Sequence, residues 1–119
     1  MANGASGLIA NVILAFMNPE DAMTVIEPAF EYYYEQNNVF GGRTKYFEMT
    51  PPSRDSSEWT IDFTELRKFF NEKTKMLIIN TPQNPTGKVL SEAEILELAA
   101  ILRDFPKVVL LSDEVIFIL

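Results

Sequence analysis

The chain has 119 residues, of which 47% are hydrophobic, and this is enough for one globular domain with a single core. Acidic residues outnumber basic ones by 17 to 10, giving a net charge of -7, so we expect no nucleic-acid partner. The absence of cysteine and histidine excludes disulfides, thiolate metal sites and imidazole catalysis. The apolar run at 8–17 is too short to span a bilayer, so we expect no membrane partner and a cytoplasmic protein, with mitochondria as the alternative compartment.

The first half of the chain predicts helices and strands in alternation. Apolar residues recur at helical spacing over 8–16, and a short apolar strand follows at 22–26. An aromatic helix is expected over 30–37, and another strand over 44–48.

The second half continues the alternation after a loop. Residues 50–59 are rich in proline, serine and charge, and a helix begins at Asp62. The apolar strands 76–79 and 108–111 flank a helix that starts at the capping box of Ser91. The order helix–strand, repeated four times, predicts an α/β fold with a mostly parallel sheet and helices on both faces. The last strand is fully apolar, as expected when both of its faces are covered.

The loop Asn-Thr-Pro-Gln-Asn-Pro-Thr-Gly-Lys at 80–88 is the strongest local signal. It follows a strand, and open α/β sheets bind ligands beyond the carboxyl ends of their strands. Its two prolines stiffen the backbone, so the amide of Asn84 can be held toward an oxygen atom of a ligand. The alternative is a plain helix-entry turn, since Asn-Pro and Thr-Gly are common turn pairs. The loop alone does not decide between these interpretations.

Three other segments lie at helix starts or strand ends. The small residues 4–7 precede a helix and suit either an anion or a simple helix entry. Phe30 can stack on a planar ligand or belong to the core. Asp113 follows the strand 108–111, which we expect beside the strand 76–79. An anion-binding helix start, an amide and a carboxylate together describe a site for pyridoxal phosphate, whose ring nitrogen the carboxylate keeps protonated.

Four stretches carry a resemblance to a known family: residues 3–7, 25–33, 80–88 and 112–115. The most specific feature is Asn-Pro-x-Gly followed, after one helix and one strand, by Ser-Asp-Glu-Val. The chain resembles the large domain of class I/II, fold-type I aminotransferases that depend on pyridoxal phosphate. Within them it is most similar to the kynurenine aminotransferase and cysteine-conjugate β-lyase group. Residues 1–119 are therefore expected to be a partial cofactor-binding large domain, without the small domain.

The resemblance implies roles around pyridoxal 5′-phosphate for seven residues. Ala5 and Ser6 would bind the cofactor phosphate, and Phe30 and Val115 would pack on the two faces of its ring. Asn84 would bind the phenolic oxygen and Asp113 the ring nitrogen, while Asn80 would lie on the substrate side. No metal ligand and no catalytic residue is assigned within the chain.

The chain departs from the family pattern in two ways. The family carries tyrosine three residues after the aspartate, where this chain has Ile116. The family's Schiff-base lysine belongs to a Ser-x-x-Lys segment expected beyond Leu119. Lys88 is expected to be the outward lysine of its motif. We expect all six lysines of the chain to be solvated surface residues: Lys45, Lys68, Lys73, Lys75, Lys88 and Lys107.

The implied function is transamination between an amino acid and a 2-oxo acid, as part of a larger enzyme that is a homodimer. Kynurenine or another aromatic or sulfur amino acid is the expected donor. The alternative is a truncated, catalytically silent paralogue that serves as a structural or assembly subunit. A nucleotide-binding module is disfavoured because the glycine-rich phosphate motifs are missing. We also expect uncovered apolar sheet edges, and poor solubility of the chain alone.

Overall fold

A computed structural model describes residues 3–54, 56 and 58–115. Helices and strands alternate along the chain and form one parallel sheet with the strand order β2-β1-β3-β4. The elements are α1 (Gly4–Phe16), β1 (Ala22–Glu27), α2 (Tyr32–Val39), β2 (Arg43–Glu48), α3 (Phe63–Lys68), β3 (Thr74–Asn80), α4 (Glu92–Asp104) and β4 (Val109–Asp113). This architecture confirms the predicted α/β fold and the predicted order of its elements.

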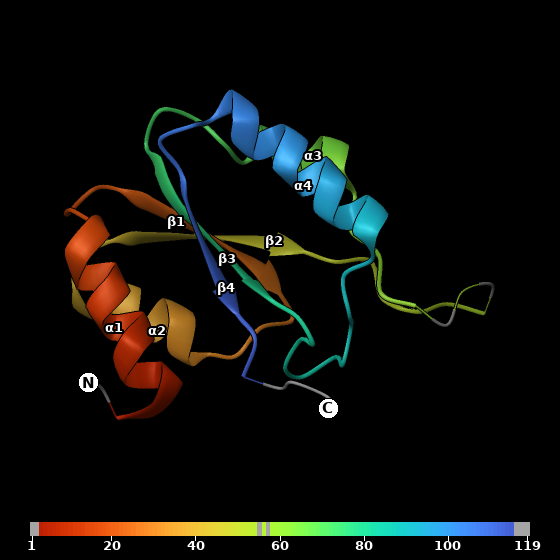
Figure 1. The fold of residues 1–119 in the computed structure, drawn as a ribbon, viewed down its shortest axis with the longest axis horizontal. Coiled ribbons are helices and arrows are strands. Elements are labelled where there is room, and N and C mark those ends of the chain that lie inside the picture. Colours follow the sequence, from red (N-terminus) through yellow and green to blue (C-terminus); the bar gives the residue numbers. More distant parts are fainter. Residues whose placement is uncertain (1–2, 55, 57, 116–119) are drawn as a thin grey trace.

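The helices cover the sheet in pairs, with α1 and α2 on one face and α3 and α4 on the other (Figure 1). Strand β3 shows why its residues 76–79 are all apolar. Met76 and Ile78 pack in the layer of α1 and α2, whereas Leu77 and Ile79 pack in the layer of α3 and α4. Successive side chains of a strand point to opposite faces, so each of these positions favours an apolar residue when both faces are covered.

The first helix begins earlier than the apolar periodicity predicts. The small residues 4–7 form the first turn of α1 instead of a loop that precedes it. Gly4 has a φ of 72°, a left-handed conformation that glycine adopts without strain. Because the turn is helical, its backbone N–H groups point outward from the amino end of α1.

Helix α4 begins with the predicted capping box. The Ser91 side chain accepts a hydrogen bond from the backbone of Glu94, whose side chain accepts one from the backbone of Ser91. The helix packs on the core through Leu98 and Ile101, while Ile95 remains 49% exposed.

Strand β4 is an edge strand of the sheet. The prediction that both of its faces are covered is wrong for the described residues, because Leu110 and Ser112, which share one face, are exposed. The strand pairs with β3 alone, and Leu110 is 42% exposed. The other edge strand, β2, carries Arg43, Lys45 and Glu48, and charges of this kind discourage edge-to-edge association. Residues 109–112 of β4 carry no charge. This apolar edge agrees with the expected solubility problem, which stays a prediction.

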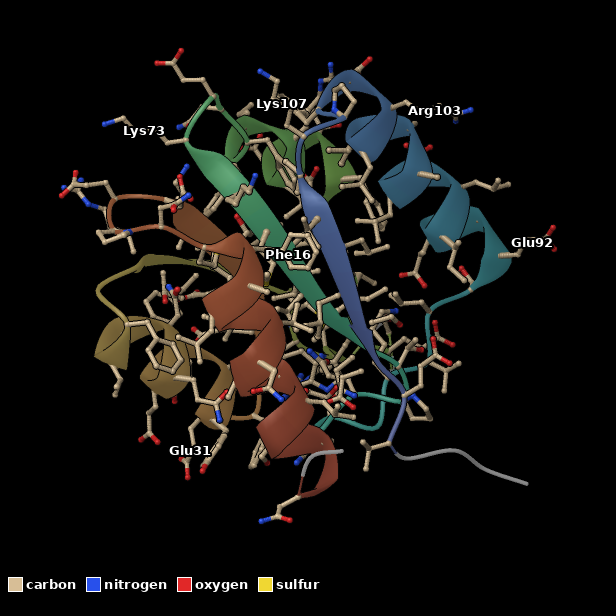
Figure 2. All side chains as sticks on the ribbon, turned by 60° about the vertical axis from the view of Figure 1, so that its left-hand side comes forward. Phe16, Glu31, Lys73, Glu92, Arg103 and Lys107 are labelled. Atoms are coloured by element: carbon tan, nitrogen blue, oxygen red, sulfur yellow. The ribbon has the colours of Figure 1, made fainter. Side chains whose placement is uncertain are left out.

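Charged side chains of the helices and turns point away from the molecule. Figure 2 shows this for Glu31, Lys73, Glu92, Arg103 and Lys107, all of which are exposed. In the part of the chain that the structure describes, no helix has both the length and the apolar character needed to cross a membrane.

The packing of α4 predicts a contrast between two leucines of the same helix. Leu98 is 3% exposed and Leu96 is 59% exposed. Leu98→Ala leaves a cavity and is expected to lower the free energy of unfolding by about 2–5 kcal/mol. The matched control Leu96→Ala should change it by less than about 0.5 kcal/mol. Urea unfolding of both variants measures the difference, and equal losses would show that α4 does not pack through Leu98.

Candidate functional site

A cavity of about 330 Å³ lies at the carboxyl ends of β3 and β4, beside the amino end of α1. Its lining contains every residue predicted for the cofactor and the substrate side. These are Ala5, Ser6, Phe30, Asn80, Asn84, Asp113 and Val115, and Ile9 and Tyr33 complete the lining. Segments far apart in the sequence thus meet at one edge of the sheet. The meeting is a structural finding, whereas the individual roles stay predictions.

The parallel register of β3 and β4 sets the floor of this site. Asn80 and Asp113 are the last residues of their strands and lie directly opposite each other. The Nδ2 of Asn80 donates a hydrogen bond of 2.8 Å to the backbone carbonyl of Asp113. The backbone N–H of Thr81 donates to the same carbonyl at 3.1 Å. The two strand ends are therefore tied together at the edge of the cavity.

The carboxylate of Asp113 is anchored by two donors. The hydroxyl of Tyr33 donates to Oδ2 at 2.6 Å, and the backbone N–H of Val115 donates to Oδ1 at 3.1 Å. A carboxylate has about four lone-pair positions on its two oxygens, so it can accept a further hydrogen bond from a ligand. The half-buried Asp113 is thus a fixed acceptor that suits a protonated ring nitrogen.

Tyr33 was not predicted as a site residue. Burial raises the pKa of its hydroxyl, and the hydrogen bond to Asp113 and the charge of that carboxylate raise it further. The hydroxyl is therefore protonated at neutral pH and acts as a donor. In the sequence, Tyr33 is one of three consecutive tyrosines. Its position three residues after Phe30 was the available signal, since residues at this spacing share one side of a helical turn. The rings of Phe30 and Tyr33 meet edge to face at 5.8 Å.

The loop 80–88 is held by hydrogen bonds from its own side chains. The backbone N–H of Asn84 donates to Oδ1 of Asn80 at 2.6 Å. The buried Gln83 donates through Nε2 to the carbonyl of Ile26 at 3.1 Å and accepts from the hydroxyl of Thr86 at 2.6 Å. The loop is therefore an ordered turn that also lines the cavity, and the contact of Asn84 with a ligand stays a prediction. The side chain of Asn84 makes no hydrogen bond to another described residue and is available to a ligand.

The amino end of α1 lacks a side-chain cap. Asn3 occupies the capping position without a side-chain hydrogen bond, and the first turn carries no acidic residue. The backbone N–H groups of the first turn therefore remain available, and together with the helix dipole they favour an anion. Gln36 of α2 donates to the backbone carbonyl of Ser6 at 3.2 Å and fixes this turn against the second helix.

The prediction that all six lysines are solvated is wrong for two of them. The Lys88 side chain is only 10% exposed, and its Nζ lies 2.8 Å from Oε1 of Glu94. Although burial opposes it, hydrogen bonds from Lys88 and Ser91 lower the pKa of Glu94, so the pair is charged. Lys45 donates to the carbonyl of Phe69 at 2.7 Å, and burial lowers its pKa. These partners come from other elements, so the local sequence does not reveal them.

No lysine lines the cavity in the part of the chain that the structure describes. The prediction concerning Ile116 lies outside the described residues. What the lining offers is a helix start for an anion, an aromatic face, an amide and an anchored carboxylate. This donor set fits a flat ring that carries a phosphate group, a protonated nitrogen and an oxygen acceptor.

Comparisons with known proteins agree with this description. A family model for aminotransferases of class I and II matches residues 1–115. Kynurenine–oxoglutarate transaminase 1 of Mus musculus is 38% identical over 118 residues, which cover 94% of this chain and 28% of that protein.

Solved structures give the same result. N-Succinyldiaminopimelate aminotransferase from Mycobacterium tuberculosis has a TM-score of 0.88 and 32% identity, with 96% of this chain and 29% of that chain covered. The pyridoxal-phosphate-bound C-S lyase from Staphylococcus hominis has a TM-score of 0.83 and 26% identity, with 93% and 28% covered. The chain spans little more than a quarter of the length of the curated relatives that it matches.

The bond between Tyr33 and Asp113 predicts how the stability of the fold responds to alkali. The pKa of Tyr33 is higher in the folded than in the unfolded chain, where it is about 10. Its contribution to stability is thus complete below about pH 10 and is lost above it, by about 1.4 kcal/mol per pH unit. Tyr33→Phe should remove this part of the alkaline loss. The free energy of urea unfolding between about pH 8 and pH 11 measures it.

The control for this experiment is Tyr32→Phe, because Tyr32 is exposed and makes no bond to Asp113. It should retain the alkaline loss of the unmodified chain. Identical pH profiles for Tyr33→Phe and the unmodified chain would show that Tyr33 does not donate to Asp113.

Proposed function

Because this chain belongs to the family of class I and II aminotransferases, we propose that it is part of an enzyme that transfers an amino group between an amino acid and a 2-oxo acid with pyridoxal 5′-phosphate as cofactor. The observation that carries the proposal is the cavity into which the first turn of α1, Asn84 and Asp113 converge. The bound cofactor supplies a protonated ring that withdraws electrons from the Cα atom of the amino acid.

Each lining group has a proposed task in holding that cofactor. The uncapped N–H groups at Ala5 and Ser6 bind the phosphate. Asp113 holds a proton on the ring nitrogen, because a fixed carboxylate beside that nitrogen favours its protonated form. Asn84 donates its amide to the phenolic oxygen, and Phe30 and Val115 pack on the two faces of the ring.

We further propose that residues 1–119 belong to the large, cofactor-binding domain, with the small domain and the Schiff-base lysine elsewhere in the protein. Two observations support this. The chain spans little more than a quarter of its curated relatives. In addition, no lysine is among the described residues that line the cavity. The tasks of this chain are therefore to bind and orient the cofactor, and the whole enzyme is proposed to act as a homodimer.

The proposed amino donor is kynurenine or another aromatic or sulfur amino acid. Its support is the 38% identity with a kynurenine–oxoglutarate transaminase. A neighbour named for N-succinyldiaminopimelate is 32% identical, so donors differ among relatives at this level of similarity. A panel of amino donors with one 2-oxo acid, assayed on the protein that carries this chain, decides the donor. Asn80 is proposed to lie on the substrate side of the cofactor.

A catalytically silent subunit is the alternative, since a lining without lysine among the described residues is equally expected for it. Borohydride reduction of the protein in the presence of pyridoxal phosphate, followed by mass spectrometry, separates the two functions. Labelling of one specific lysine supports the enzyme. A protein that binds the cofactor but is never labelled supports the silent subunit.

The role of Asp113 predicts the effect of removing one charge. Asp113→Asn in the protein that carries this chain is expected to lower kcat by about 100-fold or more, because a preorganised electrostatic partner of the reacting group is lost. Asp104→Asn makes the same chemical change at an exposed position of α4 and should leave kcat unchanged. Steady-state kinetics with a saturating amino donor measures both variants. Full activity of Asp113→Asn would refute the proposed task of this carboxylate.

A further inference from the structure

We infer that Asn80 is a positioning residue that holds Asn84 in register with Asp113, the two polar groups proposed to bind the cofactor ring. The inference rests on the proposed function, because it concerns how that site keeps its shape. The sequence places Asn80 near the substrate side only through family resemblance. The structure adds a set of contacts that gives its side chain a second and separate task.

Both polar atoms of the Asn80 side chain are engaged within the protein. The Nδ2 atom donates to the backbone carbonyl of Asp113 at 2.8 Å, across the pairing of β3 with β4. The Oδ1 atom accepts from the backbone N–H of Asn84 at 2.6 Å, four residues along the loop. One amide therefore bridges the loop and the neighbouring strand, and asparagine suits this because it carries both a donor and an acceptor.

The position of Asn84 depends on this bridge more than on the rest of the loop. Gln83 and Thr81 anchor neighbouring parts of the loop, through hydrogen bonds with Ile26 and Leu90. Among the described residues, Asn80 is the one that makes a hydrogen bond to Asn84. Since Asn84 is exposed, packing does little to hold it. Without Asn80 the backbone at Asn84 would lose its direct restraint.

The other end of the bridge has independent support. The carbonyl of Asp113 also accepts from the N–H of Thr81, and its carboxylate is held by Tyr33 and by the N–H of Val115. Loss of the Asn80 side chain should therefore displace Asn84 much more than Asp113. Asn80 therefore fixes the loop relative to the end of β4, whereas the end of β4 does not depend on the loop.

Hydrogen exchange at the backbone amide of Asn84 tests the bridge without any ligand. Asn80→Ala should accelerate exchange at this amide by about tenfold, the factor that corresponds to one hydrogen bond. Asn80→Asp retains an oxygen acceptor at the same place and should keep most of the protection. Thr81→Val removes the neighbouring bond to Leu90 and serves as the matched control, with unchanged exchange at Asn84. Unchanged exchange in Asn80→Ala would overturn the inference.

Measuring the binding of two ligands then distinguishes a positioning role of Asn80 from general damage to the fold. Asn80→Ala should weaken the binding of pyridoxal phosphate by about tenfold, because the ring contact at Asn84 is lost. It should leave the binding of inorganic phosphate unchanged, because α1 holds that group. In an Asn84→Ala background, Asn80→Ala should add less than a further change of about twofold. Equal weakening of both ligands, or additive effects of the two substitutions, would overturn the positioning role.

The outcomes distinguish this inference from the proposed function. An unmodified protein that binds no pyridoxal phosphate would refute the proposed cofactor, while exchange at Asn84 would still decide whether Asn80 holds the loop. If Asn80→Ala does not fold, Asn80→Ser carries the same expectations, because its hydroxyl is too short to bridge the loop and the strand. Cofactor binding in Asn80→Ser equal to that of the unmodified protein would count against the inference.

Discussion

Parallel pairing between β3 and β4 is the constraint on which the site depends. In a parallel pair the strands run in the same direction, so both end at one edge of the sheet. Register then places Asn80 opposite Asp113, although the two residues are 33 positions apart. A slip by one residue would send every side chain of β4 to the other face. The hydrophobic layers on both sides of β3 prevent such a slip, so the core determines where the carboxylate lies.

The same helices that bury the core also supply the walls of the cavity. Ile9 and Ile13 of α1 are buried in the layer that contains Met76 and Ile78, while the first turn of the same helix lines the cavity. In α2, Tyr33 is 2% exposed and reaches Asp113 with its hydroxyl. Core residues and cavity-lining residues thus belong to the same two helices. The packing of these helices fixes the first turn of α1 and the hydroxyl of Tyr33 at the cavity.

Much of the fold could be predicted because the sequence patterns here are local. The alternation of helices and strands, the parallel sheet and the cap at Ser91 depend on residues close together in the chain. The rule that ligands lie beyond the carboxyl ends of parallel strands predicted that Asn84 and Asp113 lie close together, whereas the places of Val115 and Asn80 were implied by the family resemblance. What escaped prediction depends on distant partners. Tyr33 meets Asp113, 80 residues away, only in the folded chain, and Lys45 meets the carbonyl of Phe69, 24 residues away.

Because the ends of β3 and β4 pair directly, the position of the cavity does not depend on α4, the helix that connects the two strands. Helix α4 lies in the chain between the loop 80–88 and β4, yet it lines no part of the cavity. Its length and surface can therefore vary during evolution or engineering while Asn80 and Asp113 keep their distance, provided that β4 returns in the same register. Changes on the exposed surface of α4 therefore leave the residues that line the cavity in place. By contrast, a residue inserted within β3 or β4 would move Asn80 or Asp113 away from the residues that it contacts.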